Sequence, residues 1–295
     1  MAGAGHARAC FLRACWLDVA VRKPGNVSLA APGHGMQAGQ FVASASAAAE
    51  PLFRRGAGVG ERIEQAMAAS WAAAGCNTNL GILLLCAPIA AAAEQPGALA
   101  SPVALSSAIE GVLARLDLAD ARGAFRAIAL AKPAGLGSAA EQDVHAAPSV
   151  GLRAAMALAA QRDSVARQYV DGFADLFELS QPLQEPGLSL LEERPFDPPG
   201  AAASARVQRV FLEFLARWPD SHIVRKHGEA VAHIVMVTAQ AWRAHDGLES
   251  DPGFVAWDES LKARGINPGT SADLTVAALL LAGLLGRREP QWHGT

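Results

Sequence analysis

Residues 80–93 read LGILLLCAPIAAAA, a strongly apolar stretch of this 295-residue chain. A second apolar run, LTVAALLLAGLL, occupies residues 274–285. Both runs fall short of the roughly 18 residues that mark a membrane-spanning helix. We therefore expect buried helices at both places and no insertion into a membrane.

The composition outside these runs is also helical. Ala, Leu, Arg, Glu and Gln recur at helical spacing, whereas alternating β-branched residues are scarce. The sequence predicts an all-α fold, a single compact multi-helix domain over residues 1–295. Gly and Pro separate the predicted helices, which cover residues 6–22, 38–54, 59–74, 80–94, 103–115, 118–131, 149–160, 163–179, 204–217, 228–245, 254–264 and 271–286.

Charge and cysteine content exclude several classes of function. The net charge of −3 and the scattered basic residues provide no surface for a nucleic-acid backbone, so we expect no nucleic-acid partner. The four cysteines form no CxxC pair and no zinc-binding spacing with histidine, which indicates reduced thiols in a cytoplasmic protein. The sequence leaves a homodimer open as the oligomeric state.

The first candidate functional segment follows the first predicted helix. It reads KPGNV at residues 23–27 and continues to PGHGM at residues 32–36. Gly and Pro allow a tight turn that presents amide donors, and Lys23 supplies a point charge suited to phosphate. Asn26 and His34 are further ligand-binding candidates. The alternative is a helix C-cap followed by an ordinary surface loop.

The second segment, GCNTNLG at residues 75–81, leads into the first apolar stretch. Asn77, Thr78 and Asn79 place hydrogen-bonding groups at the start of a buried helix, where free N–H groups favour an anion. Plain N-capping by Thr78 or Asn79 is the alternative, although it accounts for only one of these three residues.

The third segment combines a Gly-rich turn with two carboxylates. It reads KPAGLG at residues 132–137 and EQDV at residues 141–144. A phosphate-binding turn beside Glu141 and Asp143 predicts a Mg²⁺ ligand or a general base. The segment has no Walker pattern, and an ordinary Gly-rich loop is the alternative.

The fourth segment, PDSHIVRKHG at residues 219–228, places Arg225 and Lys226 beside a glycine, with Asp220 nearby. These residue types fit the recognition of a polyphosphate bridged by a metal ion. Alternatively, the basic residues end a helix and offset its dipole.

The fifth segment, NPGTSAD at residues 267–273, opens the second apolar run. Thr270 or Ser271 fits a helix N-cap, and Asp273 fits either the first helical turn or a metal site. Simple caps rarely combine so many charged and Gly-rich loops, so the five segments together favour a functional interpretation.

The five segments together resemble the triphosphoribosyl-dephospho-CoA synthase family, over about residues 9–285. The family's Lys-Pro-Gly turn is present at residues 23–25, and its closing Pro-Gly-x-Ser-Ala-Asp-Leu matches residues 268–274. The resemblance implies an all-helical enzyme that transfers a triphosphoribosyl group from ATP to the ribose hydroxyl of 3′-dephospho-CoA and releases adenine.

One family signature is matched only in part. Gly-x-Asn-Thr-His-Lys/Arg-Gly is met at Gly75, Asn77, Thr78 and Gly81. Asn79 and Leu80 stand where other members have histidine and a basic residue, which resembles a divergent branch linked to tetrahydromethanopterin-dependent one-carbon metabolism. In that branch the acceptor would be a pterin- or methylofuran-type cofactor precursor.

The implied reaction needs a triphosphate clamp, stabilisation of an oxocarbenium-like centre and deprotonation of the attacking hydroxyl. The predicted substrate-binding residues are Lys23, Asn26, His34, Asn77, Thr78, Asn79, Arg225 and Lys226. Mg²⁺, accompanying ATP as substrate, is assigned to some of Glu141, Asp143, Asp220 and Asp273. The candidate general bases are Asp143 and Asp273, with Glu61 second because a first-turn Glu also complements a helix dipole.

Two further functions remain open from the sequence. The altered signature would suit a non-catalytic partner in cofactor synthesis, whereas the charged residues kept in the other four segments favour an enzyme. A ligase or phosphotransferase acting on a one-carbon cofactor precursor would release ADP or AMP, while the family reaction releases adenine.

Overall fold

The computed structural model describes residues 2–133, 137, 141–184 and 194–286, and within these ranges it contains no β-strand. The all-α prediction is confirmed. The α-helices are α1 (Ala2–Ala20), α2 (Ala38–Leu52), α3 (Val59–Ala74), α4 (Leu80–Ala93), α5 (Pro102–Leu113), α6 (Leu118–Ala131), α7 (Leu152–Ala157), α8 (Ser164–Val170), α9 (Ala174–Ser180), α10 (Ala201–Arg217), α11 (Ser221–His227), α12 (Glu229–Trp242), α13 (Pro252–Ala263) and α14 (Gly269–Leu285).

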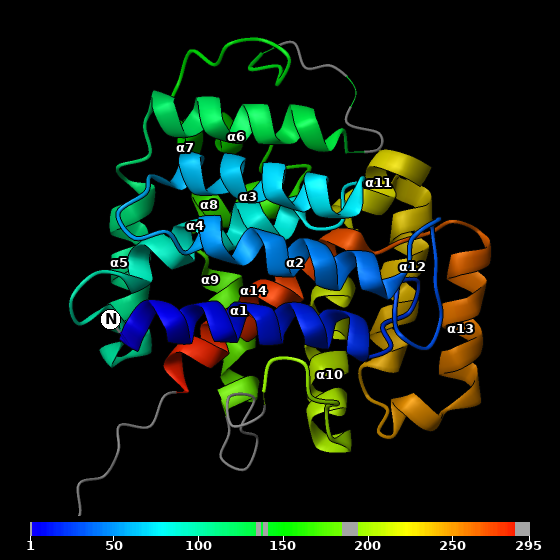
Figure 1. Ribbon diagram of the computed structural model, residues 1–295. Helices are drawn as coiled ribbons and strands as arrows, with labels where there is room; N and C mark the ends of the chain where they lie inside the picture. Colours follow the sequence, from blue (N-terminus) through cyan, green and yellow to red (C-terminus); the bar gives the residue numbers. More distant parts are fainter. Residues whose placement is uncertain (1, 134–136, 138–140, 185–193, 287–295) are drawn as a thin grey trace, which may run out of the picture.

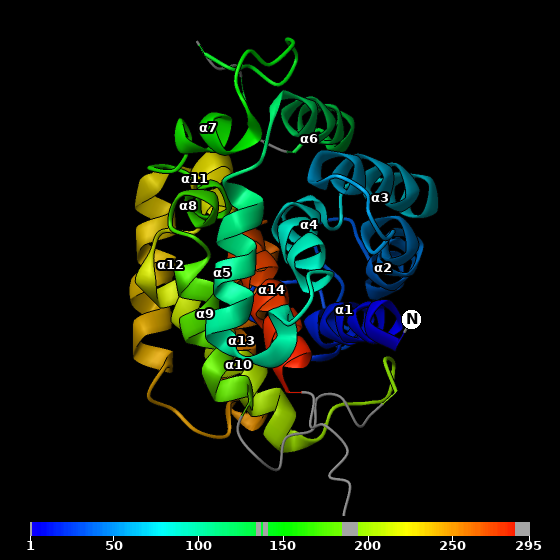
Figure 2. The ribbon, with the colours of Figure 1, turned by 90° about the vertical axis from the view of Figure 1, so that its left-hand side faces the viewer.

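Helix α14 lies at the centre of the molecule, with α1, α4, α9 and α10 packed around it (Figure 2). Both α4 and α14 are apolar on every face, and a helix of that kind is stable only when it is buried on all sides. Almost all residues of the two helices are buried, as the two apolar runs predicted. Their N-terminal ends both border the cavity described below.

The apolar interior has two parts that share α10. One face of α10 packs into the large core built by α1–α9 and α14, through Val207, Val210 and Phe214. An adjoining face, with Phe211 and Leu215, packs into a smaller core formed with α11–α13. Figure 1 shows α12 and α13 side by side at one flank of the stack formed by α1, α2, α3 and α6. The smaller core thereby supports α11, which borders the cavity.

Two helix predictions differ from the structure. The single helix predicted for residues 163–179 is wrong, because Gly172 and Phe173 adopt left-handed backbone angles that separate α8 from α9. The predicted helices do not include residues 218–227, but α11 forms there, capped by Asp220, and its last turn carries Arg225 and Lys226, as in the helix-end alternative. In the described part of the chain, the helices are all too short or too polar to cross a membrane.

Candidate active site

A cavity of about 800 Å³ receives residues from all five candidate segments. The contributions from these segments are Asn26 and Met36; residues 77–81; Pro133, Gly137 and residues 141–144; His222, Val224 and Arg225; and Asn267, Gly269, Thr270, Ala272 and Asp273. These segments are far apart in the sequence and meet because α14 lies against both α4 and α11. The cavity is therefore where the described structure brings the predicted site residues together.

Asp273 lies against the first turn of α4. A Cβ atom added to Gly81 would lie 2.7 Å from Asp273 Cγ and still closer to Asp273 Oδ2, so the carboxylate occupies space that only glycine leaves free. Burial raises the pKa of Asp273 well above its usual value, and the neighbouring carboxylate of Asp18 raises that pKa further. A protonated Asp273 can donate a hydrogen to a leaving group, a role different from the base predicted from the sequence.

Asp18, on α1, lines the same cavity and was not predicted as a site residue. Its Oδ1 lies 3.0 Å from Lys23 Nζ, and Lys23 also donates a hydrogen bond to the Asp18 carbonyl. The side chain of Lys23 is fully buried and does not line the cavity. The structure therefore places the Lys23 ammonium in an ion pair with Asp18, outside the cavity and not in contact with a phosphate there.

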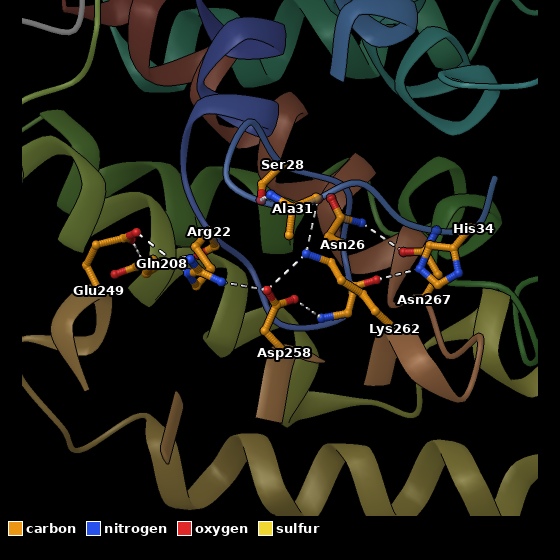
Figure 3. A network of polar contacts seen from close by, with 11 residues as sticks. Arg22, Asn26, Ser28, Ala31, His34, Gln208, Glu249, Asp258, Lys262 and Asn267 are labelled. Carbon is orange, nitrogen blue, oxygen red and sulfur yellow. Dashed lines mark hydrogen bonds and ion pairs between the residues drawn. The ribbon is translucent and has the colours of Figure 1, made fainter. Parts of the chain in front are cut away.

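The loop after α1 is tied to the C-terminal helices (Figure 3). Gly25 N donates to Asp258 Oδ1, and Asn26 Nδ2 donates to Asn267 Oδ1, each at 2.9 Å. His34 Nε2 lies 2.7 Å from the Gly25 carbonyl oxygen, and His34 does not line the cavity. Of this loop's predicted ligand-binding residues, the structure brings Asn26 to the cavity and uses His34 to brace the turn.

The start of α4 carries a chain of buried hydroxyl and amide groups. Ser44 Oγ and Thr78 Oγ1 are 2.6 Å apart, and Asn79 Nδ2 donates to Ser70 Oγ at 3.0 Å. Neither Thr78 nor Asn79 caps α4 through its side chain; instead Asn77 Oδ1 accepts from Leu80 N at 3.1 Å. The plain capping alternative therefore accounts for Asn77, while Thr78 and Asn79 have other partners.

Two arginines line the cavity, Arg162 from the turn between α7 and α8 and Arg225 from α11. Arg225 Nη1 pairs with Asp163 Oδ2 at 2.6 Å, and both residues line the cavity. Arg162 also lines the cavity, and its Nη1 donates to the Leu158 carbonyl at 3.4 Å. Neither Arg162 nor Asp163 was predicted as a site residue, because Arg162 falls between two predicted helices, Asp163 begins the second, and no Gly-rich loop marks either residue.

The third segment brings Glu141 and Asp143 to the cavity. Mg²⁺ is usually bound by one or two protein carboxylates together with substrate phosphates and water. Among the described residues, no three His, Cys, Asp or Glu side chains converge on a preformed metal site. The donor set of Glu141 and Asp143 therefore fits a Mg²⁺ ion that arrives with ATP, but not a resident ion held by protein alone.

Besides Lys23 and His34, three more predicted site residues do not line the cavity. Asp220 is buried and its carboxylate accepts hydrogen bonds from His222 N, Ile223 N, and both the N–H and the hydroxyl of Ser271. Lys226 Nζ donates to the Gly265 carbonyl at 3.3 Å on the outer side of α11. Glu61 ion-pairs with Arg54 at the surface. Asp220 thus joins α11 to α14, and none of the three is placed to touch a ligand in this cavity.

His222 lines the cavity as an uncharged side chain. Burial and, to a lesser extent, the nearby cations Arg225 and Lys226 together lower its pKa to about 4. An unfolded chain has a histidine pKa near 6.5 and binds more protons between these values, so stability falls as the pH drops from about 6.5 to about 4, by at most about 3 kcal/mol.

Replacement of His222 removes this pH dependence. We expect His222→Gln to lose less unfolding free energy than the unmodified protein between pH 7 and pH 4.5, measured by urea denaturation at each pH. The exposed His245→Gln serves as the matched control and should follow the unmodified protein. Parallel curves for all three proteins would show that His222 is charged when folded.

The comparisons with known proteins agree with this geometry. A family model described as ATP:dephospho-CoA triphosphoribosyl transferase matches residues 4–291. The chain belongs to this family. The resemblance predicted from the sequence is thereby confirmed, and the match favours the triphosphoribosyl transferase reaction over a ligase or an unrelated one-carbon enzyme.

A solved structure has the same fold as the transferase. A crystal structure from Archaeoglobus fulgidus, provisionally assigned as a triphosphoribosyl-dephospho-CoA synthase, is similar with a TM-score of 0.64 and 23% sequence identity. The similarity covers 84% of this transferase and 100% of the other chain. Identity this low supports the fold alone, and a search of curated proteins found no match.

Proposed function

We propose that this transferase binds ATP in the 800 Å³ cavity and transfers its triphosphoribosyl group to a ribose hydroxyl of dephospho-CoA, with release of adenine. The observation that carries the proposal is that all five segments shared with the family contribute residues to one cavity. Such a cavity is large enough for a nucleotide, and ligand sites are usually the concave places where polar groups converge.

The triphosphate is assigned to the arginine side of the cavity. Arg225 and Arg162 offer guanidinium donors, which bind phosphate oxygens in pairs. The N-terminus of the long helix α14, at Gly269, adds a favourable dipole for an anion. Glu141 and Asp143 would hold the Mg²⁺ that accompanies ATP, and this ion neutralises part of the phosphate charge. Lys23, Arg225 and Lys226 were predicted for this role. Lys23 and Lys226 do not line the cavity, so the role is assigned to Arg225 and Arg162.

The proton transfers are assigned to Asp18 and Asp273, two carboxylates that line the cavity. The acceptor hydroxyl forms a bond to C1′ of the ATP ribose while the bond from C1′ to N9 of adenine breaks, and its electron pair stays on adenine. Asp18, paired with Lys23, accepts the hydroxyl proton. Asp273, kept protonated by burial, donates a proton to the departing adenine. The proton count is balanced within this pair.

Chromatography of the products tests the proposal. Purified protein is incubated with Mg-ATP, with and without 3′-dephospho-CoA, and adenine, ADP and AMP are quantified. We expect adenine only when dephospho-CoA is present. ADP or AMP in place of adenine would contradict the proposed reaction, and the absence of every product would favour a different acceptor or a non-catalytic partner.

Arg162 gives a prediction about ATP affinity. Arg162→Ala removes a charge-assisted contact to phosphate, and we expect the dissociation constant for Mg-ATP to rise about 10-fold or more by calorimetry. Arg264→Ala is the matched control, because Arg264 Nε likewise donates to the carbonyl four residues before it, outside this cavity. Equal affinity in both variants would remove Arg162 from the phosphate site.

The proposal also includes a cellular location and an oligomeric state. A cytoplasmic location is supported by the cysteines of the described chain, all four of which are free thiols. A homodimer is supported only by the surface of α12, where Ile234 is 64% exposed and Val237 49% exposed one helical turn apart. Size-exclusion chromatography with light scattering would decide the oligomeric state.

A further inference from the structure

The start of α4 holds a buried amide whose orientation is decided by its neighbours. Ser70 Oγ donates its only hydrogen to the Ser44 carbonyl at 3.3 Å, so it can only accept at its remaining contact. The Asn79 amide atom 3.0 Å away must therefore be Nδ2, which is a donor. This network fixes which way the amide faces, because a flipped Asn79 would set oxygen against oxygen.

The other end of this amide has no partner. Asn79 is 3% exposed, and its Oδ1 is buried without a hydrogen-bond donor in the described structure. An unsatisfied buried acceptor costs free energy and is uncommon in folded proteins. Because Asn79 lines the cavity, a ligand bound there can supply the missing donor in place of water.

The chemistry of this position excludes an anion and favours a nucleobase. Phosphate and carboxylate oxygens carry only lone pairs, which the Asn79 oxygen repels. The neighbouring cavity residues from α4 and α6 are apolar: Leu80, Leu84, Phe125 and Ile128. A flat ring with an amino group on its edge matches an apolar wall that has one acceptor.

We infer that Asn79 Oδ1 accepts a hydrogen bond from the 6-amino group of adenine, which makes Asn79 the residue that selects ATP among nucleoside triphosphates. The inference rests on the proposed function for the identity of the nucleotide. A ribose hydroxyl is the other donor that ATP could offer at this position. The amino group is favoured, because the apolar side chains around Asn79 suit a purine ring better than a sugar.

Binding measurements without acceptor test the inference. Dissociation constants are measured by calorimetry for the Mg²⁺ complexes of ATP and purine riboside triphosphate, which lacks the amino group. We expect the unmodified protein to prefer ATP by roughly 10- to 100-fold, since an unpaired acceptor is penalised. In Asn79→Ala the preference should fall below about threefold. Equal affinities in the unmodified protein, or an unchanged preference in Asn79→Ala, would overturn the inference.

A second variant and a second analogue sharpen the result. Ser70 lies outside the cavity, and Ser70→Ala removes the partner that fixes the Asn79 amide. This variant should weaken the preference for ATP while Asn79 Oδ1 is still present. If Asn79→Ala changes discrimination against 2′-deoxy-ATP or 3′-deoxy-ATP instead, the oxygen reads a ribose hydroxyl and the assignment to adenine is wrong. Adenine release is measured separately. If the protein releases no adenine but its preference for ATP still depends on Asn79, only the proposed reaction is contradicted.

Discussion

Gly81→Ala is expected to lower kcat for adenine release on the order of 100-fold without unfolding the protein. The new Cβ would overlap the Asp273 carboxylate, which is the flexible end of a side chain and can move away. A displacement of a catalytic group by about 1 Å can cost a factor of roughly 100 in rate. In this helical position, alanine otherwise favours the helix by about 0.5–1 kcal/mol over glycine.

Stability and activity should therefore separate in this variant. Gly111→Ala in α5 is the matched control, since a Cβ there would meet only the end of the Arg115 side chain at 3.4 Å. Both variants are compared by steady-state kinetics and by urea denaturation. If Gly81→Ala keeps the kcat of the control, the position of Asp273 beside α4 does not matter for the reaction.

Asp220→Ala is expected to lower the free energy of unfolding by roughly 3–5 kcal/mol. The substitution removes an acceptor shared by four donors, two at the start of α11 and two on Ser271, and only His222 N keeps another acceptor, Thr270 Oγ1. These bonds join α11 to α14 across a buried contact, where water replaces them poorly. Urea denaturation at pH 7 measures the loss.

A second aspartate cap shows what capping alone contributes. Asp251 accepts from Gly253 N and Phe254 N at the start of α13, without a partner from a second helix. Asp251→Ala should cost only about 1 kcal/mol. Equal losses in the two variants would mean that the bonds to Ser271 contribute nothing. If Mg²⁺ stabilises the unmodified protein but not Asp220→Ala, Asp220 is a metal ligand, as the sequence predicted.

The sequence predicted those features that depend on local pattern. The apolar runs predicted buried α4 and α14, because a helix without a polar face has to be enclosed. Loop composition marked five segments that do meet at one cavity. The break between α8 and α9 was missed, because it depends on the left-handed angle of Phe173, a residue type that rarely adopts it.

The direction of individual side chains was not predictable from the sequence. The Lys-Pro-Gly turn was found, but its lysine faces Asp18 beneath the cavity because α1 presents that carboxylate five residues earlier. Asp18 itself stands in a helix with no loop signal beside it. Asp220 resembled a metal ligand because a carboxylate that ties two helices together has the same local sequence as one that binds an ion.

The central position of α14 also determines when the protein can fold during its synthesis. The helices that surround α14 leave the ribosome before Gly269 is made, so at that stage they lack the element that fills their centre. Nascent α1, α4 and α9 must then keep apolar faces exposed, a state that is prone to aggregation and to capture by chaperones. Because Asp273 arrives on the same helix, closure of the core and completion of the cavity are one event.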